Sequence, residues 1–132
     1  MKLTIIYYSQ TGNTEAMAEA VAKGAKETGA QVNLKKALDF KKDDILSADA
    51  VVFGSPNYFG DMAGAIQMVL EKTFVEMREE KITMPFAVFA SAGSRGGQEP
   101  ASRIEEICSH FGGKFGNFIF GLHYFPNVVG II

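Results

Sequence analysis

Runs of β-branched and aliphatic residues alternate along this chain with segments of helical periodicity, and this alternation limits the folds open to it more than any other feature. The expected strands cover residues 3–8, 32–34, 50–54, 86–90 and 115–122. The expected helices cover residues 14–28, 62–78 and 98–111. Strands separated by helices pair in parallel, because each helix returns the chain to the edge of the sheet where the strand began. The sequence therefore predicts an α/β fold, with a mainly parallel sheet and helices on both of its faces.

The overall composition is that of an ordinary globular protein. The 132 residues fit a single domain covering 1–132, with 47% hydrophobic and 21% charged residues. A formal net charge of -2, without a long basic block, argues against binding to nucleic acid. The single cysteine, Cys108, excludes an intramolecular disulfide, and no apolar run is long enough for a membrane-spanning helix. We expect a cytoplasmic protein that does not insert into a membrane, and its oligomeric state stays open.

Ligands of open parallel sheets bind beyond the carboxyl ends of the strands, so the loop after each strand is a candidate site. The first such loop consists of Ser9, Gln10, Thr11, Gly12, Asn13 and Thr14. It leads into a helix N-terminus, where free N–H groups, the helix dipole and hydroxyl groups favour an anion such as phosphate. The loop holds no lysine or arginine, so its donors are neutral. The alternative is an ordinary turn in which Thr11 or Asn13 caps the helix.

The second loop, residues 55–61, carries two neighbouring aromatic side chains, Tyr58 and Phe59. An exposed aromatic side chain in such a place can cover a flat ring by offset stacking. Gly60, which follows them, can adopt backbone conformations that are closed to other residues. The alternative for either ring is simple packing over the following helix.

The third loop is rich in glycine and small residues. It consists of Ser91, Ala92, Gly93, Ser94, Arg95 and Gly96. Such a loop lets a planar ligand lie against the backbone, whose N–H and C=O groups can pair with the edges of the ring. Arg95 is either a contact for a phosphate or an acidic partner, or a solvated cation of the loop.

The three loops together resemble a known family. Residues 9–14 resemble the Ser/Thr-x-Thr-Gly-Asn-Thr phosphate loop of flavodoxins. Residues 54–64 are similar to the Gly-Ser-Pro-x-x-x-Gly-x-Met-x-Gly stretch of flavodoxin-like NAD(P)H:quinone oxidoreductases, and 96–99 to their Gly-Gly-Gln-Glu. This resemblance implies a three-layer flavodoxin-like fold, with a five-stranded parallel sheet in the order 2-1-3-4-5 and helices on both faces. It also implies FMN as the cofactor.

The resemblance assigns each loop a part of the FMN site. Residues 9–14 would hold the phosphate, and residues 91–96 would wrap the pyrimidine end of the ring. The side of the isoalloxazine would be lined by Pro56, Asn57, Tyr58, Phe59 and Gly60. In flavodoxins, the peptide at the position of Gly60 and Asp61 can turn its carbonyl toward the flavin nitrogen that gains a proton on one-electron reduction.

Three functions follow from the resemblance and remain open at this point. The first is a redox protein that carries electrons between partner redox enzymes, and the second is an NAD(P)H:quinone oxidoreductase that performs two-electron reduction with FMN. The third, of another class, is a flavodoxin-like binding domain without flavin. Three features depart from the patterns of these families. A charge of -2 is small for an electron carrier that docks by charge, and the chain lacks the insertion of the quinone reductases. Both families normally end in a helix, but no helical pattern follows residue 122.

The sequence indicates no catalytic residue and no metal site. His110 has a counterpart near the flavin in the quinone reductases, although the alignment shifts there by several positions. Its alternative role is an interaction with the dipole at the end of the preceding helix. Cys108 lies at helical spacing with apolar neighbours, and we expect it to be a small buried side chain.

Overall fold

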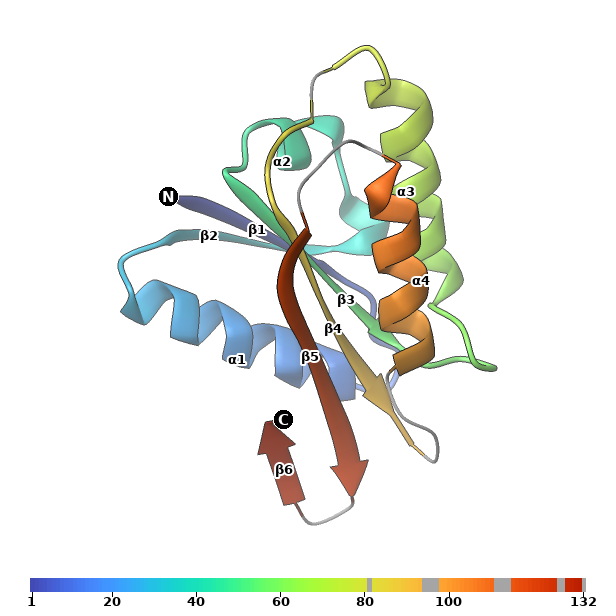
Figure 1. Cartoon of the computed structure of the whole chain (residues 1–132). Coiled ribbons are helices and arrows are strands. Elements are labelled where there is room, and N and C mark those ends of the chain that lie inside the picture. The colour runs from blue at the N-terminus through green and yellow to red at the C-terminus, as the bar shows by residue number, and fades with distance from the viewer. Residues whose placement is uncertain (81, 94–97, 111–114, 126–127, 132) are drawn as a thin grey trace.

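The computed structural model describes residues 1–80, 82–93 and 98–110 in full and, for the strands at 115–125 and 128–131, the backbone alone. Within these residues the chain forms one sheet in the order β2-β1-β3-β4-β5-β6 (Figure 1). The strands are β1 (Lys2–Tyr7), β2 (Gln31–Lys36), β3 (Ala50–Pro56), β4 (Phe86–Ala92), β5 (Phe115–Phe125) and β6 (Val128–Ile131).

The first five strands are parallel, which confirms the predicted order 2-1-3-4-5. The sheet then continues with β6, which pairs with β5 in the antiparallel direction. The sequence did not predict this extension, because a four-residue edge strand contains too few residues for a periodic signal and depends on pairing with its neighbour.

Helices cover both faces of the sheet, as predicted. They are α1 (Asn13–Glu27), the short α2 (Lys42–Leu46), α3 (Gly64–Met77) and α4 (Gln98–Ser109), with a 3-10 turn at Ala37–Asp39. Figure 1 shows α1 on one face of the sheet and α3 and α4 on the other, where residues of both helices join one hydrophobic cluster. None of the helices that the structure describes is long and apolar enough to span a membrane. The sequence analysis missed α2, since five residues complete little more than one helical turn.

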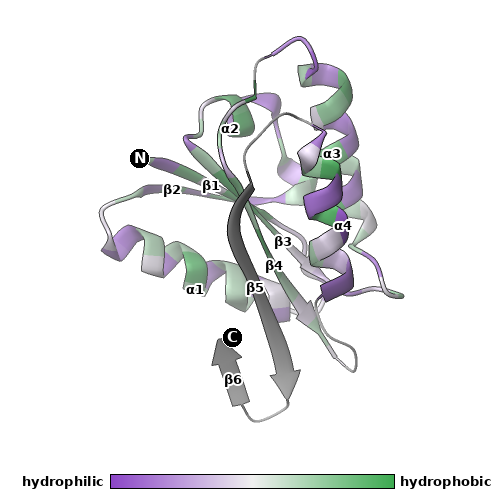
Figure 2. Ribbon diagram, viewed as in Figure 1, coloured by the Kyte–Doolittle hydropathy of each residue, from purple (hydrophilic) through white to green (hydrophobic). Residues whose placement is uncertain are grey.

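The sheet separates two hydrophobic clusters, because successive side chains of a strand point to opposite faces. Leu3, Ile5 and Tyr7 of β1 pack with α1, whereas Ile6 packs with the cluster beneath α3 and α4. In Figure 2 the described central strands are largely hydrophobic, while hydrophilic residues mark the outer sides of the helices. Cys108 lies in the α3–α4 cluster, as expected, and burial raises the pKa of its thiol.

Gly54 permits close packing in the middle of β3, next to the loop that follows this strand. A Cβ atom at this position would lie 2.1 Å from Cζ of Phe89. Phe89 is only 1% exposed and belongs to the cluster beneath α1. The ring therefore occupies the space that any side chain at position 54 would need.

We expect Gly54→Ala to lower the free energy of unfolding by about 3 kcal/mol, because overpacking forces the ring or the backbone to move. Urea unfolding followed by circular dichroism measures this change. The control is Gly24→Ala in α1, where nothing lies within 4 Å of the new Cβ. This control should gain about 0.5–1 kcal/mol, because alanine favours a helix interior. Equal unfolding midpoints of the two variants would contradict the close packing of Gly54.

Candidate functional site

The three candidate loops meet around one hollow of about 210 Å³ at the carboxyl ends of β1, β3 and β4. We call this hollow the edge pocket. Its lining residues come from all three loops: Ser9, Gln10, Thr11, Asn13, Thr14, Pro56, Asn57, Tyr58, Ser91, Ala92 and Gly93. None of these lining residues carries a charged side chain. The pocket therefore offers neutral hydrogen-bond donors and acceptors together with the Tyr58 ring.

The N-terminus of α1 forms one wall of the edge pocket. Gly12 is its N-cap residue, at φ 98°, and no side chain caps the helix. The alternative that Thr11 or Asn13 caps α1 is thus not realised, since the chain enters the helix through a left-handed glycine. Ser9 Oγ instead accepts a hydrogen bond of 3.1 Å from the N–H of Gly12. The N–H groups of the first helical turn, which have no acceptor within a helix, are left for another partner.

A buried tyrosine fixes this helix end against the sheet. The hydroxyl of Tyr7, the last residue of β1, donates a 3.0 Å hydrogen bond to Oε2 of Glu15 in the first turn of α1. Burial, followed by the hydrogen bond and charge of Glu15, raises the pKa of Tyr7 to about 12. The phenol therefore stays protonated at neutral pH and keeps donating to the carboxylate.

Two buried hydroxyl groups join the first loop to the third. Thr14 Oγ1 and Ser91 Oγ lie 2.7 Å apart, and the two residues are only 2% and 7% exposed. A hydroxyl group has one proton to donate and two lone pairs to accept with. If Ser91 donates to Thr14, the Thr14 proton is available to an acceptor in the edge pocket.

The second loop ends in a tight turn at the mouth of the pocket. Tyr58 and Asp61 exchange backbone hydrogen bonds of 2.9 and 3.0 Å, and the residues between them have positive φ, 55° at Phe59 and 79° at Gly60. Two central residues of positive φ define a type I′ turn. A bulky residue such as Phe59 is strained there, and its side chain is fully exposed, at 108%.

Tyr58 is held in place by two contacts. Its ring packs edge-on against Tyr8, with centroids 6.4 Å apart and an angle of 80°. Its hydroxyl lies 3.5 Å from Oε1 of Gln10, at the limit of hydrogen-bonding distance. Burial, with a smaller contribution from Tyr8, raises the pKa of Tyr58. The one aromatic side chain among the lining residues is therefore fixed by the first loop and by the end of β1.

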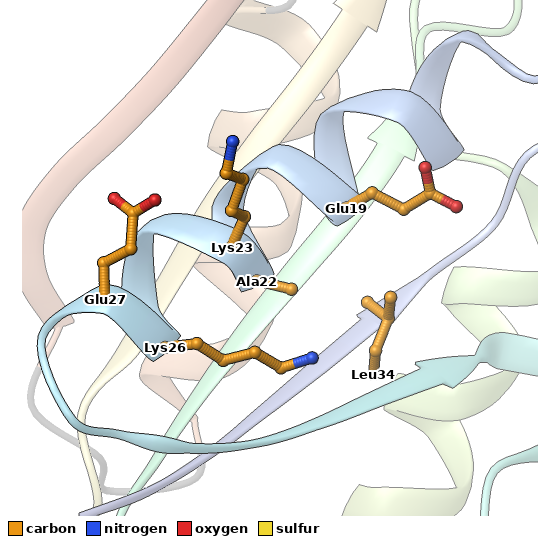
Figure 3. A pocket seen from close by; sticks show the side chains of 6 residues that line it. All are labelled: Glu19, Ala22, Lys23, Lys26, Glu27 and Leu34. Carbon is orange, nitrogen blue, oxygen red and sulfur yellow. The ribbon is translucent and has the colours of Figure 1, made fainter.

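A second and larger hollow, of about 430 Å³, lies between α1 and β2, away from these loops (Figure 3). It is lined by Glu19, Ala22, Lys23, Lys26, Glu27 and Leu34. In Figure 3 the Lys26 side chain runs from α1 toward Leu34, while Lys23 and Glu27 extend away from Leu34. Charges of both signs line this hollow, and no predicted site residue reaches it. The edge pocket, where the predicted site residues meet, is therefore the candidate functional site.

Most of the predicted site residues line the edge pocket, but not all. Gly12, Phe59 and Gly60 belong to the same loops without lining the hollow. Ser94, Arg95 and Gly96 fall outside the described residues. His110 lies just beyond the C-terminal end of α4. The first turn of α4 is the end that contacts the edge pocket, through the bond of Glu99 to Asn57. The length of the helix therefore separates His110 from the pocket. Among the described residues, no cluster of His, Cys, Asp and Glu side chains could hold a metal ion.

Two further residues take part in the site although the sequence analysis did not select them. Tyr8 supports Tyr58, and Glu99 of α4 accepts a 3.2 Å hydrogen bond from Nδ2 of Asn57. Tyr8 belongs to an apolar run that indicates a strand, which conceals its role. Glu99 is 42 residues away from Asn57 in the chain, so only the folded arrangement reveals this contact.

Two curated relatives of this chain carry the name NAD(P)H dehydrogenase (quinone). An NAD(P)H dehydrogenase (quinone) 3 of Rhizobium meliloti is 35% identical over 120 residues, which cover 74% of this chain and 57% of the relative. An NAD(P)H dehydrogenase (quinone) of Geotalea daltonii is 34% identical over 126 residues, 75% of this chain and 62% of the relative. The chain thus spans less than two thirds of the length of these relatives.

Solved structures and a family model give a more extensive match. A flavodoxin from the domain Archaea superposes with a TM-score of 0.82 at 26% identity, over 96% of this chain and 86% of that protein. The family model described as Flavodoxin matches residues 5–127, which is nearly the whole sequence. The chain belongs to the flavodoxin family.

Proposed function

We propose that this chain binds FMN in the edge pocket and uses it to carry electrons between partner redox enzymes. Membership of the flavodoxin family implies a flavin cofactor. The observation that carries the proposal is the meeting of the three loops around one hollow at the carboxyl ends of β1, β3 and β4. This is where open parallel sheets bind their ligands. Bound flavin supplies the redox chemistry, and the chain supplies binding, orientation and the electrostatic environment.

The donor set at the start of α1 fits a phosphate group. The helix has no side-chain cap, so the N–H groups of its first turn and the positive end of its dipole are available to an anion. Hydroxyl groups of Ser9, Thr11 and Thr14 stand beside this helix end in the edge pocket. These neutral donors hold the FMN phosphate in our proposal, and the Ser91 hydroxyl orients that of Thr14 toward it.

The other lining residues fit a planar ring. Pro56, Asn57 and Tyr58 line the pocket at the end of β3 and in the loop after it, and Ser91, Ala92 and Gly93 line it at the end of β4. The Tyr58 ring, fixed by Tyr8, provides an apolar surface for the isoalloxazine. Gly60 lies in the strained turn that follows Tyr58 and remains a predicted contact of the ring. Residues 94–96 also remain predicted ring contacts. Binding energy from these groups would hold the ring in one orientation toward its redox partner.

A second candidate is an NAD(P)H:quinone oxidoreductase. It is supported by the names of the two curated relatives at 34% and 35% identity. The carrier is supported by the family model described as Flavodoxin, which matches residues 5–127, and by the archaeal flavodoxin, which superposes with a TM-score of 0.82 at 26% identity. We therefore place the carrier first, with partner redox proteins as its electron donor and acceptor, and NAD(P)H with a quinone second.

We expect Thr11→Val and Thr14→Val each to weaken FMN binding by roughly tenfold or more, because each removes a hydroxyl donor to a charged phosphate. Titration of the apoprotein with FMN, followed by quenching of flavin fluorescence, gives the dissociation constants. Thr28→Val is the matched control at the far end of α1, where the hydroxyl donates a 2.7 Å hydrogen bond to the carbonyl of Ala25. Thr14→Ser, which keeps the hydroxyl, should bind nearly as the unaltered protein does.

Affinities of both valine variants equal to that of Thr28→Val would overturn the phosphate assignment. Thr14 is buried, so its variant also needs a stability measurement. Urea unfolding separates a loss of binding from a loss of fold, and Thr11, which is exposed, serves as the variant with an undisturbed core.

Stepwise reduction of the FMN-loaded protein, followed by visible spectroscopy, separates the two candidate functions. A carrier is expected to accumulate a one-electron-reduced flavin and to oxidise NAD(P)H slowly. Direct two-electron reduction, with rapid turnover of NAD(P)H and a quinone, would contradict the carrier and establish the reductase. A protein that binds no flavin would contradict both and leave a flavodoxin-like binding domain.

A further inference from the structure

Helix α3 presents apolar side chains to the solvent as well as to the sheet. Ile66, Val69 and Leu70 are buried in the α3–α4 cluster. Met68 and Val75 are exposed, with exposed fractions of 38% and 65%, although both are apolar. Seven residues span about two helical turns, so these two side chains lie one above the other on the outer face of the helix. We call this pair the α3 stripe.

The outer face of α3 differs in this respect from those of the other long helices. No large apolar side chain that the structure describes is exposed on α1 or α4. A helix with a solvated outer face carries polar residues there, whereas apolar residues on opposite sides are typical of a helix that packs on both. A single exposed apolar residue is ordinary on a protein surface. Two in line on one helix form a candidate contact.

Opposite charges flank the α3 stripe. At about 100° per residue, Glu71 falls on one side of the line from Met68 to Val75, and Lys72 falls on the other. Both charged side chains are exposed. Glu71 accepts a 3.3 Å hydrogen bond from Gln67, and neither Glu71 nor Lys72 forms an ion pair with another described residue. Both charges are therefore available to a partner that lies along the stripe.

The two charges match each other when two copies of the chain meet with their α3 helices parallel. A twofold axis parallel to the helices sets each stripe residue against its counterpart, Met68 on Met68 and Val75 on Val75. One side of each helix then faces the other side of its partner, so Glu71 of each copy lies opposite Lys72 of the second copy. An antiparallel pair would instead set Glu71 against Glu71 and Lys72 against Lys72, which is unfavourable.

We propose that the outer face of α3 is a self-association surface, through which two copies of this chain pair by their α3 stripes with Glu71 of each opposite Lys72 of the other. A formal net charge of -2 causes little overall repulsion between two copies. A contact between two helices of 14 residues buries less than the standard interface of about 1,600 Å², so the dimer is weak and reversible. No residue of the stripe lines the edge pocket, so the pairing does not depend on FMN binding.

Sedimentation velocity of the full chain over a concentration series measures this association. We expect a monomer–dimer equilibrium that Val75→Glu weakens roughly tenfold or more, because this change places two carboxylates in the centre of the contact. Val75 is exposed, so the fold should be kept, and urea unfolding checks this. The matched control is Ala20→Glu, which adds the same charge at an exposed position of α1, on the opposite face of the sheet.

Two results of this experiment would overturn the proposal. One is a monomer at every concentration up to about 1 mM. The other is a dimer whose dissociation constant Val75→Glu and Ala20→Glu change equally, since such a dimer would use another surface.

Charge reversals test the register of the two helices. Glu71→Lys and Lys72→Glu each turn two attractive pairs into repulsive ones, so each should weaken the dimer roughly five- to thirtyfold. The double variant, Glu71→Lys with Lys72→Glu, restores opposite charges and should dimerise as the unaltered protein does. Single reversals that leave the dissociation constant unchanged would overturn the parallel pairing, because an antiparallel pair sets like charges together in either case.

A cysteine crosslink tests the twofold arrangement. Val75→Cys sets two thiols face to face across the axis of the parallel dimer, within reach of a disulfide. Mild oxidation at a concentration that populates the dimer should then give a crosslinked dimer on a non-reducing gel. The native thiol of Cys108 is buried and offers no competing crosslink. Ala20→Cys is the control, and equal crosslinking of the two variants, or none of either, would overturn the parallel arrangement.

Discussion

Parallel pairing of β1, β3 and β4 is the constraint on which the rest of this structure depends. The register sets Tyr7 opposite Gly54 and Pro56 opposite Ser91, so the three strands end at one edge of the sheet. Loops that are far apart in the sequence thus meet around one hollow. The hydrogen bonds between Thr14 and Ser91, and between Asn57 and Ser91, then join these loops to each other. The edge pocket is a consequence of strand order.

The pocket is built from neutral donors and a strained turn. The uncapped start of α1 and the surrounding hydroxyl groups offer an anion several weak donors that the fold has already ordered. Burial of Tyr7 and its bond to Glu15 fix the position of this helix end. The turn at Phe59 is strained by positive φ and exposes an aromatic ring, which is typical of residues retained for function. The strain thus lies in the loop that also supplies Asn57 and Tyr58 to the edge pocket.

Periodicity predicted the long helices and the strand order, because each of these elements buries a continuous apolar face. The same reasoning failed for α2 and β6, which contain only five and four residues. The alternative interpretation of the first loop, with Thr11 or Asn13 as the helix cap, is not realised, since Gly12 adopts a left-handed conformation in place of a side-chain cap. The contact between Asn57 and Glu99 spans 42 residues and leaves no pattern in the sequence. Loop composition therefore located the pocket, and only the folded chain revealed how its parts are held.

The comparison of FMN with riboflavin tests the central claim most directly, because the two ligands differ only in the phosphate. Both are titrated into the apoprotein, and quenching of flavin fluorescence gives their dissociation constants. The account predicts that FMN binds at least about a hundredfold more tightly than riboflavin, since several charge-assisted hydrogen bonds are lost with the phosphate. Equal affinities would contradict a phosphate site at the start of α1, and an absence of binding by either ligand would contradict the flavin assignment.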